Sequence, residues 1–480
     1  MRIKSYAFLL LALSCFTRVQ AQNGVHQQSS TYEWPKEPEV RQKLDKWQDQ
    51  KFGMLIHWGL YAVPGIIESW ELCSEPWIER DSTIAYEDYK KWYWGLSKEF
   101  NPVKFNPEAW AKAGKDAGMK YMVFTTKHHD GFAMFDTKQS DFSIANGPFA
   151  NSPRKDVAKH VFDAFRKQDF MIGAYFSKPD WHSQYFWWSK YATPDRNVNY
   201  DIRKYPWRWN QFKSFTYNQL SELMSNYGSV DILWLDGGWV RPLSTVNDEV
   251  RSWGAAIPEW DQQVDMPKIA QMARAKQPGL LMVDRTVHGP YENYQTPEQK
   301  IPERQLDHPW ESCLTLGNAW GFVKNDQYKP ASEVIRAMAE VVAKGGSLLL
   351  GVGPQPDGAL PATAVSRLEE IGRWLKINGK AIYGTRITKN YVDGNTWFSQ
   401  SKDGQQKFAI HCLAKDATPA ASLSWNGNVP AKGATITLLN TGKSVKWSVK
   451  DDVVTVQLPA SLKNNPDLFG ALAFAYKAQQ

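Results

Sequence analysis

The sequence contains few cysteines and no histidine motif of a metal site. Only four of its 480 residues are cysteines, and Cys73, Cys313 and Cys412 are too scattered for a disulfide framework or a zinc spacing. The nine histidines form neither an H-x-H nor an H-E-x-x-H motif. We therefore expect no bound metal and no cofactor.

Blocks of like charge and long apolar runs are also missing. The 57 Lys and Arg residues and the 50 Asp and Glu residues give a net charge of +7, and the basic residues are scattered. This distribution does not predict a nucleic-acid partner. The apolar stretch near the N-terminus, residues 7–13, is too short to cross a bilayer, so no transmembrane segment is expected.

The N-terminus has the pattern of an export signal. The basic start MRIK precedes residues 7–13, and Val19-Gln20-Ala21 resembles a small-residue cleavage site. The pattern predicts a signal peptide over residues 1–21 and export to a bacterial periplasm or cell surface. A lipid anchor at Cys15 is the weaker alternative, because Ala12 stands where a bulky aliphatic residue is expected.

Apolar runs alternate with amphipathic stretches between about residues 50 and 380. The runs are rich in Val, Ile, Leu and aromatic residues, which is typical of strands buried on both faces. They lie at 52–59, 119–132, 170–177, 230–239, 279–285 and 345–354. The helical patterns lie at 107–118, 155–168, 212–227, 266–276 and 332–344. The alternation predicts a parallel α/β fold, and its length fits a (β/α)₈-like TIM barrel over residues 34–383. An open doubly wound sheet is the alternative.

The pattern changes after residue 383. Short strand patterns separated by Asp-Gly, Asn-Gly and Thr-Gly turns replace the helical periodicity. They lie at 396–401, 407–412, 434–439, 445–449 and 453–458. They predict a C-terminal antiparallel β-sandwich over residues 384–480.

Polar residues stand at the ends of the predicted parallel strands. His57 ends the first run, His128 and His129 end the second, Asp236 ends the fourth and Arg285 ends the fifth. The C-terminal ends of barrel strands form one face, where active sites lie. These residues should therefore converge, although more than 200 positions separate the first from the last.

Asp236 is the candidate nucleophile. A carboxylate at the end of the apolar strand VDILWLD is costly to bury unless it is paired or used. It could instead cap the turn at Gly237-Gly238. Attack on an anomeric carbon needs an ionised carboxylate held in one geometry, and Trp234 should point to the same face.

The paired histidines favour sugar hydroxyls over a metal. Adjacent residues on a strand point in opposite directions, so His128 and His129 should not both bind one ion. An imidazole can donate and accept hydrogen bonds in a fixed plane. The 23 Trp, 20 Tyr and 22 Phe residues supply rings that stack on sugars, although most of them are expected in the core.

A second carboxyl group is needed as general acid/base. The candidates after Arg285 are Glu292, Glu298, Glu303 and Glu311, and spacing does not choose among them. Glu298 lies in an irregular segment with two prolines, which could be a loop that leans over the barrel mouth. Glu311 is expected near the end of a sixth strand.

Taken together, these segments resemble the α-L-fucosidases of glycoside hydrolase family 29. The matching segments over residues 34–385 are FGMLIHWGLYAVP, TTKHHDGFAMFD, YFSKPDW, ILWLDGGW, VDR and HPWESC. The resemblance implies a (β/α)₈-like barrel followed by a β-sandwich. It also implies hydrolysis of terminal α-L-fucose with retention of configuration and without a metal, so the expected partner is a fucosylated oligosaccharide or glycoconjugate.

The resemblance also implies roles for individual residues. The nucleophile falls on Asp236 and the general acid/base on Glu298, with Glu311 as the alternative. The expected substrate-binding residues are His57, Trp77, His128, His129, Tyr175, Trp181, Trp234 and Arg285. Asp236 attacks C1 while protonated Glu298 donates to the leaving oxygen, and Glu298 then activates water.

One segment departs from the family pattern, and other classes of function remain open. Many members have Glu-Trp-Tyr where this chain has SEPWIER, so Pro76 replaces a sugar-binding Glu and Glu75 is a candidate substitute. The alternatives are another retaining glycosidase such as an α-galactosidase, a sugar-binding protein without turnover, or a metal-dependent hydrolase using His57, His128, His129 and Asp236.

Overall fold

The computed structural model describes residues 32–75, 78, 80–477 and 479 of the chain. The predicted signal peptide and Cys15 lie outside these residues, as do Pro76 and Trp77. Within the described part, no helix combines the length and the apolar character that a membrane span requires.

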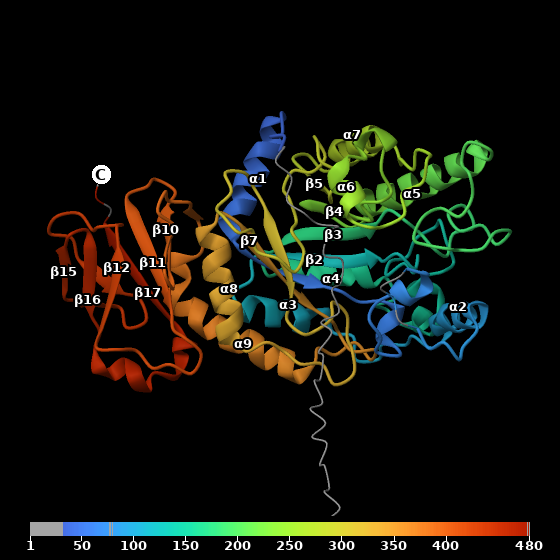
Figure 1. Cartoon of the computed structure of the whole chain (residues 1–480). Coiled ribbons are helices and arrows are strands. Elements are labelled where there is room, and N and C mark those ends of the chain that lie inside the picture. The colour runs from blue at the N-terminus through green and yellow to red at the C-terminus, as the bar shows by residue number, and fades with distance from the viewer. Residues whose placement is uncertain (1–31, 76–77, 79, 478, 480) are drawn as a thin grey trace, which may run out of the picture.

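A curled parallel sheet forms the N-terminal part of the described chain (Figure 1). Its seven strands are β1 (Phe52–Ile56), β2 (Tyr121–Lys127), β3 (Met171–Ser177), β4 (Ile232–Asp236), β5 (Leu281–Asp284), β6 (Glu311–Thr315) and β7 (Ser347–Val352). Their order is β5-β4-β3-β2-β1-β7-β6, and every neighbouring pair is parallel. The predicted (β/α)₈-like barrel is therefore confirmed, although β6 was not among the predicted runs.

An irregular segment fills the space between β5 and β6, where a regular barrel has its remaining strand. Glu292 forms an antiparallel bridge with Val283 of β5, and Glu298 forms a parallel bridge with Cys313 of β6. Pro297 lacks an N–H group, yet its carbonyl accepts from the Cys313 amide. The segment expected to lean over the mouth is thus part of the barrel wall, which the two flanking strands hold in place.

Helices surround the sheet. They are α1 (Pro38–Gln50), α2 (Tyr86–Gly95), α3 (Pro107–Asp116), α4 (Val157–Arg166), α5 (Pro206–Asn226), α6 (Asp248–Ser252), α7 (Met266–Lys276), α8 (Ala331–Ala343) and α9 (Ala362–Asn378). The five predicted helices match α3, α4, α5, α7 and α8. Helix α5 begins earlier than expected because Pro206 occupies its first turn, where a missing N–H costs nothing.

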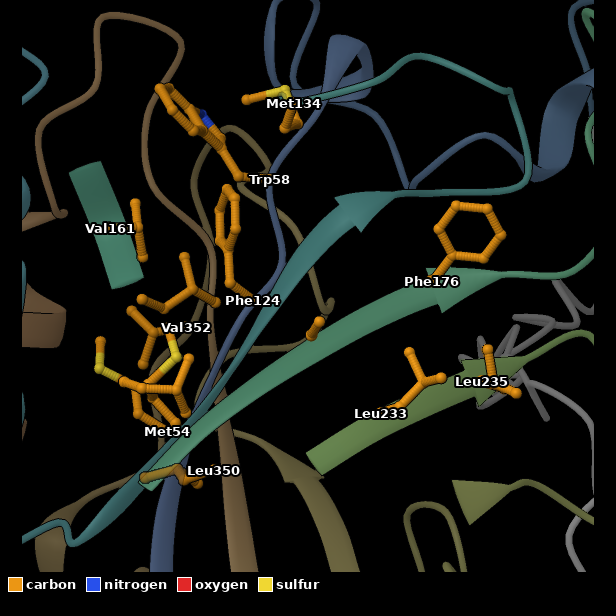
Figure 2. Packing of buried hydrophobic residues seen from close by; sticks show 14 of the residues in the cluster. Met54, Trp58, Phe124, Met134, Val161, Phe176, Leu233, Leu235, Leu350 and Val352 are labelled. Carbon is orange, nitrogen blue, oxygen red and sulfur yellow. The ribbon is translucent and has the colours of Figure 1, made fainter. Parts of the chain in front are cut away.

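The outward side chains of the strands pack against these helices. Figure 2 shows Phe124, Leu233 and Leu350 on the strands, with Val161 of α4 among the residues packed there. Because successive residues of a strand alternate between faces, the intervening positions point into the barrel.

The inward side chains fill the barrel from its base to its mouth. Leu55, Ile232, Trp234, Leu281 and Val283 belong to this separate inner core. Helix α1 completes the core at the base, where Trp47 stacks on Tyr294 with ring centroids 4.0 Å apart. Continuing the inward alternation by one step leads to the polar residues at the mouth.

Antiparallel strands form the C-terminal part. They are β8 (Thr385–Arg386), β9 (Val392–Asp393), β10 (Thr396–Ser401), β11 (Gln406–Cys412), β12 (Ser422–Asn426), β13 (Ile436–Leu438), β14 (Lys443–Val445), β15 (Trp447–Lys450), β16 (Val453–Gln457) and β17 (Ala471–Lys477). They make two sheets around a core that contains Trp425 and Phe474. The sheets lie against α8 and α9, on the outer side of the barrel (Figure 1). The expected strands match β10, β11, β13, β15 and β16, whereas β8, β9, β12, β14 and β17 were missing from the expected set.

Gly53 permits the close packing at the barrel base. A Cβ atom at Gly53 would lie 2.4 Å from the ring of the fully buried Tyr121. Gly53→Ala should therefore lower the free energy of unfolding by about 1–3 kcal/mol, as overpacking does. Urea denaturation measures this change.

Gly95→Ala is the matched control. No atom lies within 4 Å of a Cβ built at Gly95, which ends α2, so alanine there should change stability by less than about 1 kcal/mol. An unfolding midpoint of Gly53→Ala equal to that of the wild type would contradict the packing described for the base.

Candidate active site

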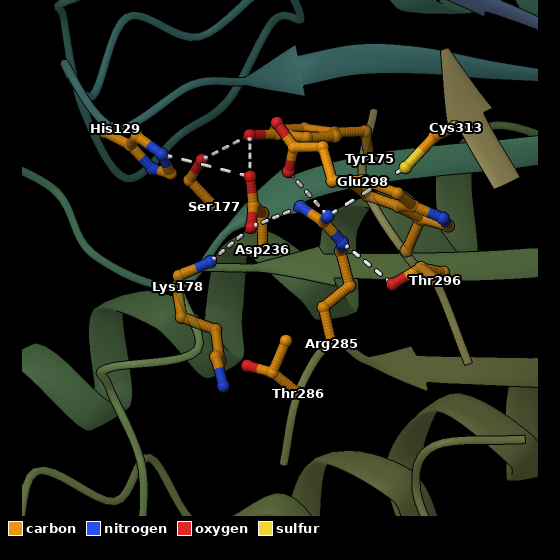
Figure 3. Close-up of polar contacts among 12 residues, drawn as sticks. His129, Tyr175, Ser177, Lys178, Asp236, Arg285, Thr286, Thr296, Glu298 and Cys313 are labelled. Carbon is orange, nitrogen blue, oxygen red and sulfur yellow. Dashed lines mark hydrogen bonds and ion pairs between the residues drawn. The ribbon is translucent and has the colours of Figure 1, made fainter. Parts of the chain in front are cut away.

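Polar side chains converge at the C-terminal ends of the strands. His57 follows β1, His128 and His129 follow β2, Asp236 ends β4 and Arg285 follows β5. Direct contacts join several of these residues to Tyr175 and Glu298 (Figure 3). The predicted convergence at the mouth is therefore present in the structure.

Asp236 is held by donors on both of its carboxylate oxygens. Oδ1 accepts from Nη1 of Arg285 at 2.9 Å and from the Gly237 amide at 2.8 Å. Oδ2 accepts from the hydroxyl of Tyr175 at 2.7 Å and lies 3.8 Å from Nε2 of His129. The side chain is still 14% exposed, so a carboxylate held in one orientation is accessible from the mouth.

Arg285 is buried and oriented by its surroundings. Its guanidinium carbon lies 4.2 Å from the centroid of the Trp234 ring, and Nε donates to Oγ1 of Thr296 at 3.0 Å. Burial opposes its charge, but the carboxylates of Asp236 and Glu298 outweigh this and hold the pKa of Arg285 above its ordinary value. Arg285 is therefore a permanent cation at the centre of the site.

Glu298 is the second carboxylate bound by Arg285. Oε2 accepts from Nη2 of Arg285 at 2.8 Å, and Oε1 accepts from the Trp320 indole at 3.1 Å. Nη1 and Nη2 of a single guanidinium therefore contact two different carboxylates, as Figure 3 shows. The structure therefore brings Asp236 and Glu298 together on one guanidinium.

Glu311 is not at the mouth. It is the first residue of β6, at the opposite end of the strand from the one expected, and it is fully buried. Its oxygens accept from the Tyr121 hydroxyl at 2.6 Å and from the Trp234 indole at 3.1 Å. Burial raises the pKa of Glu311 to about 7. Glu311 therefore supports Trp234 from inside the barrel and cannot reach a leaving group.

The histidine pair does not follow the expected alternation. Both residues lie beyond the end of β2, and the ring centroids of His128 and His129 are only 4.1 Å apart. The prediction that they point in opposite directions is wrong because they belong to a turn and not to the strand. His57 lies beside them, 4.8 Å from His128 between centroids.

The three histidines are neutral imidazoles. Burial lowers the pKa of His57 and His128 well below the ordinary value, and lowers that of His129 to about 3. Nδ1 of His128 lies 2.6 Å from Oγ of Ser69, whereas Nε2 of His57 has no hydrogen-bond partner among the described residues. A neutral imidazole with a free nitrogen can bind a hydroxyl group.

The other predicted binding residues have different positions. Tyr175 contacts Asp236, and Trp234 lies beneath Arg285. Trp181 is 2% exposed and packs behind His129, with centroids 5.3 Å apart, so it supports the pocket from behind. Trp77 lies outside the described residues.

Glu75 does not replace the missing family carboxylate. It is buried, and its Oε1 lies 2.7 Å from Nε of Arg196. The guanidinium of Arg196 in turn lies over the rings of Trp70 and Trp239. The expected substitution is therefore not supported by the structure, because Arg196 occupies this carboxylate.

Several residues at the mouth were not predicted from the sequence. Trp70 and Trp239 each lie 5.0 Å from His129 between ring centroids, and Trp320 binds Glu298. Glu68 also lies there, and its carboxylate and the ring nitrogens of His57 and His128 lie within 4.8 Å of one another. Glu68, Trp239 and Trp320 lie in loops and Trp70 begins a short 3₁₀ helix, so no periodic pattern in the sequence marked them. His57, Glu68 and His128 could together hold a metal ion. This set differs from the expected metal alternative, which was His57, His128, His129 and Asp236.

Comparisons with known proteins agree on one family. The sequence model described as alpha-L-fucosidase matches residues 19–380. The plasma alpha-L-fucosidase of Homo sapiens is 28% identical over 437 residues, 87% of this chain and 86% of that protein.

Solved structures of the same kind share the fold. Alpha-L-fucosidase isoenzyme 1 from Paenibacillus thiaminolyticus has a TM-score of 0.72 and 29% identity, covering 92% of this chain and 100% of that one. A covalent intermediate of an alpha-L-fucosidase from Bacteroides thetaiotaomicron, trapped with 2-fluoro-fucosyl fluoride, has a TM-score of 0.68. Its identity is 23%, and it covers 95% of this chain and 99% of that one.

Proposed function

The chain belongs to the α-L-fucosidase family, a family of glycoside hydrolases, and from this premise we propose that it removes terminal α-L-fucose from glycans with retention of configuration. The single observation that carries the proposed mechanism is the bridging of Asp236 and Glu298 by Arg285. Retaining glycosidases need two carboxyl groups ~5–5.5 Å apart, and one shared guanidinium is suited to hold them in that relation.

Asp236 acts as the nucleophile. Arg285 and the Gly237 amide donate to Oδ1, and the Tyr175 hydroxyl donates to Oδ2. These donors favour the charged form of the carboxylate and fix its orientation for attack on C1. The product of this step is a covalent glycosyl ester on Asp236. Because the ester is neutral, the ion pair between Arg285 and Asp236 weakens in this step.

Glu298 acts as general acid and then as general base. In the free structure both of its oxygens accept hydrogen bonds, from Arg285 and Trp320, which is the arrangement of the ionised base. Protonating the leaving oxygen requires a proton on one of these oxygens, and each of them has a second lone pair that can carry it. The carboxylate form then draws a proton from water as the ester is hydrolysed.

The remaining groups at the mouth suit a 6-deoxy sugar. The neutral histidines offer fixed donors and acceptors to hydroxyl groups, and Trp70 and Trp239 offer an apolar wall to the C5 methyl group. A galactoside carries a hydroxymethyl group at C5, which such a wall disfavours.

We also propose that the protein is exported. The basic start, short apolar stretch and Val19-Gln20-Ala21 motif support cleavage after residue 21. The destination is a bacterial periplasm or cell surface, and its substrates are fucosylated oligosaccharides or glycoconjugates.

Asp236→Ala tests the nucleophile. The wild type should release 4-nitrophenol from its α-L-fucoside and not from its α-D-galactoside. The variant should lose at least ~10³-fold in kcat, because no other group can attack C1. Wild-type turnover by a folded Asp236→Ala protein would refute the assignment, and faster galactoside hydrolysis would refute the substrate.

Glu298→Gln tests the general acid. The loss in kcat/KM should be ~10²–10⁴-fold with an oligosaccharide leaving group, and far smaller with an activated nitrophenyl group that needs no protonation. Glu311→Gln is the matched control and should keep most of the activity on both substrates, since Glu311 is buried below Trp234. Equal losses on the two substrates for Glu298→Gln would exclude it as the acid.

A further inference from the structure

A buried ion pair crosses the end of the strand that bears Asp236. Lys178 directly follows β3, Asp284 ends β5, and β4 lies between these two strands in the sheet. The ammonium group of Lys178 contacts Oδ1 of Asp284, and the two side chains are only 1% and 2% exposed. The pair therefore joins the two neighbours of β4 behind the candidate nucleophile.

The ion pair lies on the outer face of the sheet, away from the sugar pocket. Alternation along β5 puts Asp284 on the same face as Met282, which packs in the outer core. Val283 belongs to the inner core, and Arg285 reaches Asp236 at the mouth. The pair thus stands outside the space in which the sugar would bind, and it can affect the reaction only through other residues.

Backbone contacts couple the ion pair to the charged groups at the mouth. Figure 3 shows Lys178 beside Asp236, and the Lys178 amide donates to the Asp236 carbonyl at 2.9 Å. Asp284 directly precedes Arg285, whose amide donates to the carbonyl of Leu235 on β4 at 3.2 Å. A shift of Lys178 or Asp284 would therefore move the backbone of Asp236 or Arg285.

The turn after Asp236 is packed tightly between the same two segments. A Cβ atom at Gly237, whose φ angle is +87°, would lie 2.2 Å from Cδ of Pro179. One at Gly238 would lie 2.0 Å from Oγ1 of Thr286. Pro179 and Thr286 belong to the segments that the ion pair joins, so the pair closes a ring around this turn.

Stability alone gives no reason for two charges in this position. Burial lowers the pKa of Lys178 and raises that of Asp284, and each side chain opposes the shift of the other. An ion pair that is buried so deeply contributes little to stability compared with an apolar pair of similar size. What it adds is a contact with one geometry, since a charged hydrogen bond is directional and apolar packing is not.

We propose that Lys178 and Asp284 are positioning residues, which set the Asp236 carboxylate relative to Arg285 and to C1 of the sugar. This inference rests on the proposed function, because it concerns the same reaction. A nucleophile displaced by about 1 Å can lose ~10²-fold in rate. Binding of the sugar depends on other groups of the pocket, so the ion pair should act on kcat and not on KM.

The test uses Lys178→Met and the double variant Lys178→Met/Asp284→Leu. Lys178→Met leaves the Asp284 carboxylate buried without a cation, which should lower the melting temperature, whereas the double variant should recover it. With 4-nitrophenyl α-L-fucoside, both variants should lose ~10–100-fold in kcat and change KM by less than about threefold. Circular dichroism verifies that each protein is folded at the assay temperature.

Lys43→Met is the matched control. Nζ of Lys43 lies 2.5 Å from Oδ1 of Asp231, which precedes β4 at the end of the strand remote from the site. This second pair is also attached to β4, so its loss reports what an ion pair on this strand contributes to folding. The kcat and KM of Lys43→Met should equal those of the wild type.

Three results would overturn the proposal. The first is wild-type kcat in the folded double variant, which would leave the ion pair a role in folding alone. The second is an equal loss of kcat in Lys43→Met, and the third is a rise in KM that accounts for the whole loss in kcat/KM. If the double variant does not fold, Lys178→Met, assayed below its unfolding transition, is judged by the same criteria. A wild type that fails to hydrolyse the fucoside refutes the proposed function, whereas these three results refute the positioning role alone.

Discussion

The site depends on one guanidinium that binds two carboxylates. Arg285 contacts Asp236 and Glu298 through different nitrogens, and it is itself held over the ring of Trp234. Without this cation, two carboxylates in a buried space would repel each other, and one of them would take up a proton. With Arg285 in place, the site holds a charged Asp236 and positions Glu298 before the substrate binds.

The barrel supplies the conditions for that interaction. Inward alternation on β4 and β5 brings Asp236 and Arg285 to the mouth, and the irregular wall segment brings Glu298 opposite them. The buried ion pairs Lys127–Asp180 and Lys178–Asp284 join the loop after β3 to the ends of β2 and β5. The C-terminal sheets pack on outer helices and add no side chain to this site within the described residues.

Residues on regular elements could be predicted, and residues on irregular ones could not. Asp236 and Arg285 follow from strand periodicity, because the alternation of an apolar strand determines which face its last residue joins. Glu298 could not be separated from Glu311 by spacing, since a proline-containing segment replaces a strand between them. Glu68 was missed because a left-handed turn, which leaves no periodic pattern, directs its side chain inward.

The identity of the nucleophile is the central claim, and covalent labelling tests it most directly. The intact protein would be treated with 2-fluoro-fucosyl fluoride, digested, and mapped by tandem mass spectrometry. A fluorofucosyl adduct on Asp236, absent when free fucose protects the site, is the predicted result. An adduct on another carboxylate would contradict this assignment. So would the absence of any adduct, if NMR shows that the first sugar product has inverted configuration.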